Sequence, residues 1–169
     1  MRASVAIAVA AAVSACIPSP SRADVHVGDS FPPLASAGLV GNPLPRTAGK
    51  VVLVDFFASW CAPCKASFPA YGRLNAEFAA RGLVIVAVSV DQVAGDYDAF
   101  VRALAPTFFV TLDRDQRLVR EAGVPTMPTS YLVDRMGRVR YVHPGFRGAE
   151  TERALRTEIA GLVAENAPY

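Results

Sequence analysis

The chain has 169 residues, of which 52% are hydrophobic and 19% are charged, which is enough apolar sequence for one globular domain with its own core. Its 17 basic and 15 acidic residues nearly balance, and Arg2 and Arg22 both precede residue 24, so residues 24–169 carry equal numbers of each. Because no basic patch or long run of Lys and Arg is left, the charge excludes a typical nucleic-acid-binding protein.

Residues 1–23 have the composition of an export signal. Arg2 precedes an apolar run over residues 3–13, and small residues and prolines follow this run. The run is shorter than the roughly 20 apolar residues of a membrane-spanning helix. We therefore expect export from a bacterial cytoplasm and no permanent membrane helix.

Two processing sites compete. Residues 21–23 (Ser-Arg-Ala) fit a small-x-small cleavage site before Asp24, whereas the segment that ends at Cys16 resembles a lipoprotein signal. The second site would leave Cys16 acylated and the protein anchored to a membrane. We favour the first, and so predict a signal peptide over 1–23 and a single domain over 24–169, with a lipid anchor at Cys16 as the alternative.

The first core elements predict a strand, a helix and a strand. After an extended lead-in over residues 24–50, which leaves room for one short strand, the apolar and β-branched runs 51–57 and 83–90 are typical of strands buried on both faces. Between them, apolar residues recur at helical spacing, and Arg81-Gly82 is a helix stop. Such a unit predicts two parallel strands joined by a right-handed crossover.

The remaining elements complete an α/β fold. After the second strand, apolar residues again recur at helical spacing in several segments, and one segment with alternating apolar and polar residues predicts an antiparallel hairpin. We expect a central mixed β-sheet flanked by helices on both faces. The predicted elements are a helix over 96–105, a strand over 108–113, a helix over 116–124, a hairpin over 130–143 and a helix over 149–163.

Two cysteines follow the first strand directly. Cys61 and Cys64 are separated by Ala62-Pro63, and this places Cys61 in the first turn of the helix, where free N–H groups and the helix dipole favour a thiolate. Cys64, three residues later, lies on the same face. Cys61 is therefore predicted to attack a substrate disulfide, and Cys64 to resolve the mixed disulfide that results. Cys64 is expected to be the more buried thiol.

Two other interpretations of the pair are weaker. A purely structural disulfide between such near neighbours would close a short loop and add little stability. A zinc site needs four ligands, and the other candidates, His26 and His143, are distant and lack the usual spacing. We therefore favour a redox-active Cys61–Cys64 disulfide that needs no bound cofactor and no metal.

At these residues a family resemblance becomes visible. The segment VDFFASWCAPCK (54–65) resembles the thioredoxin active-site segment. Together with the export signal, the WCxPC and FP motifs resemble the TlpA/ResA-like extracytoplasmic branch of the thioredoxin superfamily. A second segment, GVPTMPTSYLVD (123–134), is similar to the one that faces the cysteines in this family. The resemblance covers most of residues 27–165 and implies a thioredoxin fold.

The resemblance also implies a substrate-binding surface. Pro128 stands in the position of the family's cis-proline, and the backbone of Met127 before it would pair with an incoming substrate chain. Trp60 would offer an apolar docking face or, alternatively, only a half-buried packing residue. Gly145 would allow a partner backbone to approach closely. Independently of the family, Pro63 stiffens the loop between the two cysteines.

Asp55 is an acid inside an otherwise apolar strand. Burial should raise its pKa, because a charged and unpaired carboxylate would be costly there. Asp55 matches the buried aspartate of thioredoxin, which implies that it exchanges a proton with Cys64 through water. The TlpA/ResA-like branch often carries a glutamate three residues after the second cysteine, where this chain has Ser67. The alternative is that Asp55 only hydrogen-bonds a neighbouring helix.

These features predict a thioredoxin-like thiol-disulfide oxidoreductase in the periplasm or at another extracytoplasmic face. The resemblance implies a reducing monomer that acts on exported proteins with cysteines, including the haem-site cysteines of apocytochrome c. Its electrons would come from a membrane thiol reductase of the CcdA/DsbD kind. A thioredoxin-fold chaperone or a copper-handling assembly factor is the alternative, whereas the peroxidase motif Pro-x-x-x-Thr-x-x-Cys is absent.

Overall fold

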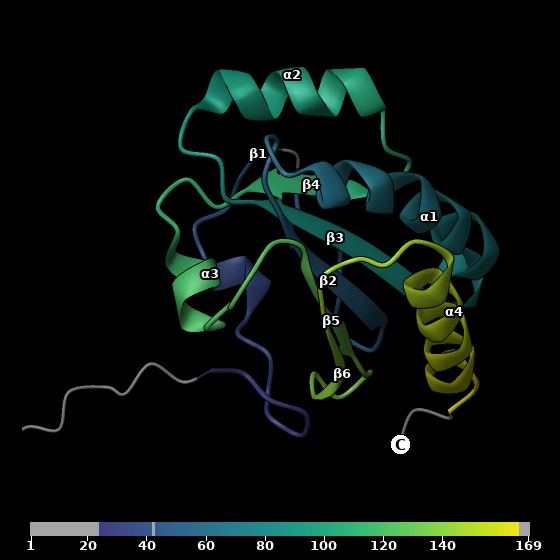
Figure 1. Cartoon of the computed structure of the whole chain (residues 1–169). Coiled ribbons are helices and arrows are strands. Elements are labelled where there is room, and N and C mark those ends of the chain that lie inside the picture. The colour runs from purple at the N-terminus through teal and green to yellow at the C-terminus, as the bar shows by residue number, and fades with distance from the viewer. Residues whose placement is uncertain (1–23, 42, 166–169) are drawn as a thin grey trace, which may run out of the picture.

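A computed structural model describes residues 24–41 and 43–165. The predicted signal peptide and Cys16 lie outside the described residues. Over the described part, six strands form one mixed sheet in the order β1-β4-β3-β2-β5-β6, with four α-helices around it (Figure 1). None of these helices is long and apolar enough to cross a membrane.

The predicted strands and helices are all present, with ends that differ by a few residues. The lead-in adds a two-residue edge strand and a short 3-10 helix at Leu34–Ser36. The strands are β1 Val40–Gly41, β2 Val51–Phe57, β3 Leu83–Ser89, β4 Phe109–Leu112, β5 Thr129–Val133 and β6 Val139–Pro144. The helices are α1 Ala62–Phe78, α2 Ala94–Leu104, α3 Arg117–Glu121 and α4 Ala149–Ala164.

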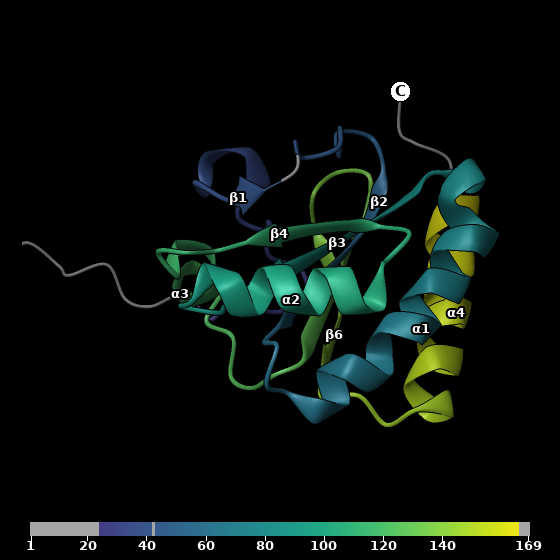
Figure 2. The same cartoon turned by 90° about the horizontal axis from the view of Figure 1, so that it is seen from above.

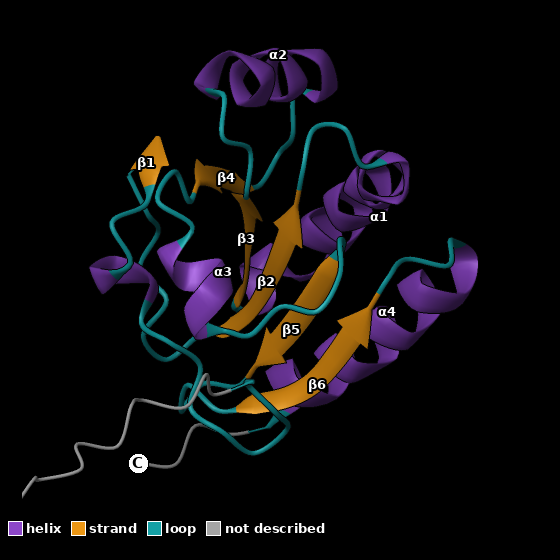
Figure 3. Ribbon diagram, turned by 60° about the vertical axis from the view of Figure 1, so that its left-hand side comes forward, coloured by secondary structure: helices purple, strands orange, loops and turns teal. Residues whose placement is uncertain are grey.

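The centre of the sheet is parallel and its other side is antiparallel. β2 pairs in parallel with β3, and β3 with β4, as the strand-helix-strand pattern predicts. β5 and β6 form the predicted antiparallel hairpin, and β5 is also antiparallel to β2. Every residue of β2 is buried, because neighbouring strands and layers cover both its edges and both its faces (Figure 3). β2 thus carries its carboxyl end, and the loop after it, out of the core.

Helices cover both faces of the sheet. Phe57 of β2 contacts Phe68 of α1 and Phe100 of α2, with ring centroids 5.0 and 4.9 Å apart, so α1 and α2 share one face. α4 lies beside α1 (Figure 2). On the opposite face, Tyr131 contacts the ring of Phe56 and donates a hydrogen bond to the carbonyl oxygen of Ala122, just after α3. The predicted α/β architecture is confirmed.

Candidate active site

The cysteine pair lies at the amino-terminal end of α1, beyond the carboxyl end of β2. Cys61 and Cys64 form a disulfide, with Cα atoms 5.3 Å apart. Cys61 is the N-cap residue, one position before the predicted first turn, because its backbone is still extended (φ −82°, ψ 110°). Its sulfur accepts a hydrogen bond of 3.3 Å from the backbone N–H of Cys64. A sulfur thus occupies the place that a capping oxygen takes in many helices.

The exposure of the segment follows the predicted order. Cys64 is fully buried, whereas Cys61 retains 5% of its accessible surface, so the prediction that Cys64 is the more buried thiol is confirmed. Pro63 lies in the first turn of α1, where a missing N–H costs no helical hydrogen bond. Trp60 is 74% exposed, which agrees with an exposed apolar face and not with a half-buried packing residue.

A buried carboxylate holds the loop that precedes Cys61. Asp91 accepts hydrogen bonds from the backbone N–H of Ser59 at 3.1 Å, from the hydroxyl of Ser59 at 2.8 Å and from the hydroxyl of Ser89 at 2.7 Å. This contact was missed at the sequence level. Its signal is an acid just after the strand next to β2, because parallel strands end at the same edge of a sheet.

The cis-proline segment reaches the same end of β2. The Met127–Pro128 peptide bond is cis, as the family resemblance implied. Thr129 pairs with Phe56, near the end of β2, so Pro128 lies beside the point where the chain leaves for the cysteines. The N–H of Gly145 donates to the carbonyl oxygen of Pro128 at 2.7 Å. Gly145 has φ +84°, and no atom lies within 4 Å of where a Cβ would stand, which leaves room for another chain.

Asp55 is fully buried and bonded to α1. The hydroxyl of Tyr71 donates to its Oδ1 at 2.8 Å, whereas Oδ2 has no hydrogen-bond partner in the described part of the chain. Burial raises the pKa of Asp55 from 3.8 to about 8, and the hydrogen bond from Tyr71 only partly opposes this. The predicted rise in the pKa is confirmed, and Asp55 also makes the bond to a neighbouring helix that the alternative interpretation requires.

Ser67 lies between Cys64 and Tyr71 on the buried stripe of α1. It is fully buried, and its hydroxyl donates to the carbonyl oxygen of Cys64 at 2.9 Å. Cys64, Ser67 and Tyr71 are three and four residues apart in turn, so they lie on one helix face. One face of α1 thus carries both Cys64 and the tyrosine whose hydroxyl bonds Asp55.

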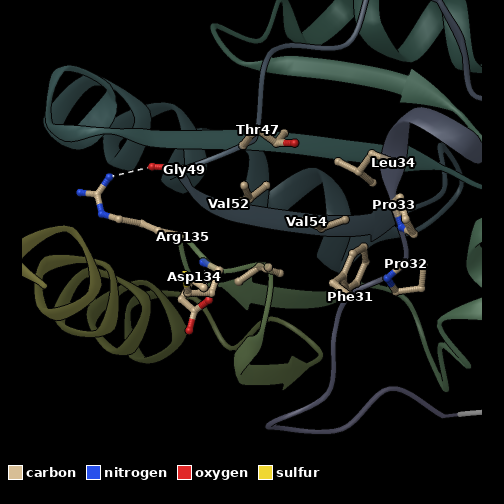
Figure 4. Close-up of a pocket in the computed structure, with 14 residues that line it drawn as sticks. Phe31, Pro32, Pro33, Leu34, Thr47, Gly49, Val52, Val54, Asp134 and Arg135 are labelled. Carbon is tan, nitrogen blue, oxygen red and sulfur yellow. Dashed lines mark hydrogen bonds between the residues drawn. The ribbon is translucent and has the colours of Figure 1, made fainter. Parts of the chain in front are cut away.

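Two pockets differ in their relation to the cysteines. A groove of about 540 Å³ runs between Trp60 and Lys65 on one side and α2 on the other, where Phe100 and Leu104 line it. A second pocket, of about 380 Å³, is shown in Figure 4. Val52 lines it, and because strand side chains alternate, it lies on the opposite face of β2 from Asp55. Of these two pockets, the groove beside Trp60 adjoins the site.

Neither histidine is close to the cysteines in sequence, and the hydrogen-bond partners of both lie elsewhere. His143, for which the sequence indicated no partner, lies 2.7 Å from the carboxylate of Glu158. The backbone N–H of His26 donates to Asp29. Within residues 24–41 and 43–165, no three His, Cys, Asp or Glu side chains are grouped as metal ligands would be.

Comparisons with known proteins agree with this geometry. The sequence model of the Redoxin family matches residues 26–159. The thiol-disulfide oxidoreductase ResA of Geobacillus thermodenitrificans is 29% identical over 123 residues, which are 72% of this chain and 71% of that protein. ResA of Bacillus subtilis is 33% identical over 97 residues, 57% of this chain and 54% of that protein.

Solved structures give the same result. A protein from Chlorobium tepidum described as a thiol:disulfide interchange protein DsbE superposes with a TM-score of 0.73 at 34% identity, over 83% of this chain and 99% of its own. StoA from Bacillus subtilis superposes with a TM-score of 0.56 at 26% identity, over 63% and 82%. The chain therefore belongs to the Redoxin family, and it is a thiol-disulfide oxidoreductase with a thioredoxin fold.

Proposed function

We propose that this protein reduces disulfide bonds of exported proteins on the outer side of a bacterial cytoplasmic membrane, with Cys61 as the attacking thiol and Cys64 as the resolving thiol. The observation that carries the assignment of roles is the hydrogen bond from the N–H of Cys64 to the sulfur of Cys61 at the tip of α1. A further support is the difference in exposure between the two cysteine residues.

The tip of α1 favours the ionised form of the Cys61 thiol. Free N–H groups at a helix N-terminus carry partial positive charge, and one of them already points at this sulfur. A thiolate is the reactive form in disulfide exchange. Cys61 is also the cysteine that retains some accessible surface. Attack on an external disulfide therefore falls to Cys61.

Reduction then proceeds in two exchanges. The Cys61 thiolate attacks one sulfur of the substrate disulfide, forming a mixed disulfide and releasing the first substrate sulfur as a thiolate. Cys64 loses its proton and attacks the sulfur of Cys61, which forms the Cys61–Cys64 disulfide and releases the second substrate thiolate. Both substrate thiolates take up protons, so the substrate gains two electrons and two protons. The enzyme supplies both electrons; counted from its dithiol form it gives up two protons, one when Cys61 ionises and one when Cys64 attacks.

Asp55 is proposed to receive the proton that Cys64 loses. A carboxyl group with a pKa of about 8 can both accept and return a proton near neutral pH. Its buried position, and its link through Tyr71 to the helix of Cys64, support this role. In the reverse direction the protonated carboxyl group would return the proton to Cys64 as the disulfide opens.

The substrate chain is proposed to bind along the cis-proline segment and the groove beside Trp60. An extended chain could pair with the backbone of Met127, since edge backbone groups recognise peptides by strand addition. The free space at Gly145 and the exposed ring of Trp60 would accommodate it. Pro63 would keep the two sulfurs close while this chain is bound.

The biological setting is part of the proposal. The relatives named ResA and DsbE support a role outside the cytoplasm, in cytochrome c maturation or general thiol reduction. Each cycle leaves the Cys61–Cys64 pair oxidised, so a membrane thiol reductase of the CcdA/DsbD kind would have to reduce it again. We propose that the protein acts as a monomer, with this disulfide in place of a bound cofactor, after removal of residues 1–23 or anchored through Cys16.

The direction of electron flow is tested by the reduction potential of the pair. Equilibration with glutathione buffers should give a value near that of thioredoxin, about −270 mV, and the reduced protein should reduce insulin. A value near that of DsbA, about −120 mV, would reverse the assigned direction. Failure to reduce insulin, together with stoichiometric copper binding, would favour a copper-handling factor instead.

The assignment of the two thiols has its own test. Cys64→Ser should accumulate a mixed disulfide between Cys61 and the substrate, because the resolving thiol is missing. Cys61→Ser should accumulate none. Trapping by Cys61→Ser, or equal trapping by both variants, would contradict the assigned roles.

A further inference from the structure

A cluster of buried hydroxyl groups surrounds the phenol of Tyr71. Tyr71 retains only 1% of its accessible surface, and Ser67 and Ser130 are equally buried. Burial, and next the nearby Asp55, raise the pKa of Tyr71 well above its usual value, and the neighbouring hydroxyl groups of Ser67 and Ser130 only partly oppose this. The phenol is therefore un-ionised near neutral pH, and its proton is directed to Asp55.

The two carboxyl oxygens of Asp55 have different surroundings as a result. Oδ1 accepts the 2.8 Å hydrogen bond from Tyr71, whereas Oδ2 has no partner in the described part of the chain. The residues beside Asp55 in the sheet are Ala87 on β3 and Ser130 on β5, neither of which titrates. From α1, the titratable group that bonds Asp55 is Tyr71, on the same helix as Cys64.

We propose that Tyr71 is a positioning residue for the exchange reaction: its hydroxyl holds Oδ1 of Asp55, which leaves Oδ2 as the oxygen that accepts and returns the proton of Cys64. This inference rests on the proposed function, because it assumes that Asp55 is the base for Cys64. It adds a residue that neither the cysteine motif nor the family resemblance indicated.

The chemistry explains why the donor matters. When Cys64 gives up its proton, Asp55 becomes protonated at Oδ2, and when the proton returns, a carboxylate is left in an apolar site. A hydrogen bond to a carboxylate is stronger than one to the neutral acid, so Tyr71 stabilises the ionised form in which Asp55 can act as a base. Without this donor, a smaller fraction of Asp55 would be ionised near neutral pH.

The test is the pH dependence of the Cys64 step in Tyr71→Phe. Stopped-flow reaction of the reduced protein with an aromatic disulfide releases one thiolate when Cys61 attacks and a second when Cys64 resolves the mixed disulfide. In Tyr71→Phe the second phase should slow by about tenfold at pH 7, and its midpoint should move to higher pH by about one pH unit. The first phase should not change, since Tyr71 does not contact Cys61 in this scheme.

Tyr97→Phe is the matched control. It also removes a buried hydroxyl, one that donates to the carbonyl oxygen of Val110 away from Asp55, and both phases should follow the wild type. A ¹³C titration of the Asp55 carboxyl group in the reduced protein should show the same upward shift in Tyr71→Phe. If this variant does not fold, Tyr71→Leu, which also removes the hydroxyl, replaces it, and an upward shift there supports the inference while an unchanged titration overturns it.

The outcomes distinguish failure of the positioning role of Tyr71 from failure of the proposed function. If Asp55→Asn removes the pH dependence of the second phase but Tyr71→Phe matches the wild type, the positioning role of Tyr71 is wrong and the proposed function stands. If Asp55→Asn also matches the wild type, both the base and its positioning residue are wrong. If the wild-type protein releases no thiolate, the proposed function itself fails.

Discussion

Replacement of Asp55 by Asn should stabilise the protein at neutral pH. The folded state raises the pKa of this carboxyl group from 3.8 to about 8 because burial disfavours the charged form. Between these values the folded protein holds a proton that the unfolded chain has released. The contribution of Asp55 to the free energy of unfolding is therefore greatest below about pH 4, falls as the pH rises, and stops falling above about pH 8. Asparagine is neutral in both states, so the variant lacks this dependence.

The size of the effect follows from the same two values. Each pKa unit corresponds to 1.36 kcal/mol, so the wild type loses about 4 kcal/mol between pH 4 and pH 7 from Asp55 alone. The hydrogen bond from Tyr71 is retained in the variant if the amide oxygen takes the place of Oδ1. Asp55→Asn should then exceed the wild type by about 4 kcal/mol at pH 7 and by little at pH 4.

Urea unfolding of the oxidised proteins at pH 4, 5, 6, 7 and 8 measures this difference. Asp91→Asn is the control, because it changes an equally buried acid whose carboxylate accepts hydrogen bonds from Ser59 and Ser89, and it should lower stability. A difference in the free energy of unfolding at pH 7 that is half as large as expected would still be measurable. A gap between Asp55→Asn and the wild type that stays constant from pH 4 to 8 would show that the carboxyl group is ionised in the folded protein and would refute the reasoning.

Two further predictions concern the frame around the site. Asp91→Ala should cost about 2–4 kcal/mol in urea unfolding, because it leaves the N–H of Ser59 and two hydroxyl groups without their acceptor. A loss below about 0.5 kcal/mol would mean that water replaces the carboxylate. Phe68→Ala should cost about 3–5 kcal/mol, because its ring contacts Phe57, Phe100 and Phe108. Phe109→Ala, at a ring that is 43% exposed, should cost less than about 1 kcal/mol, and equal losses in the two variants would contradict the assigned core.

The parts of the fold that the sequence predicts are those with a local pattern. β2 and β3 are apolar runs rich in β-branched residues, and their parallel pairing agrees with the prediction, with β3 ending one residue before its predicted end. The hairpin of β5 and β6 follows from alternation around a four-residue turn. β1 is different, because two residues carry no period, and its pairing with β4 depends on a contact about 70 residues away.

The parts of the site that the sequence does not predict depend on side chains brought together by the fold. The cysteine pair and Asp55 are visible because an unusual residue interrupts a regular pattern. Tyr71 looks in sequence like one more apolar position on the buried stripe of α1, and only the packing of α1 on β2 shows that its hydroxyl meets Asp55. The contact of Asp91 with Ser59 joins residues 32 positions apart, and that of His143 with Glu158 joins two elements.

The destabilisation that Asp55 causes in the folded state bears on why an acid occupies this position. A domain of this size has a net stability of about 5–15 kcal/mol, so a loss of about 4 kcal/mol at pH 7 is a large part of it. In return, Asp55 makes one side-chain hydrogen bond, to Tyr71, and a bond to a neutral carboxyl group contributes only about 0.5–1.5 kcal/mol. Packing alone would favour a neutral residue there. Asp55 destabilises the fold and has a pKa of about 8 beside the helix that carries the cysteines, so proton transfer explains its presence better than structure does. The two measurements on Asp55→Asn should therefore change in opposite directions: the free energy of unfolding should rise, and the rate of the Cys64 step should fall.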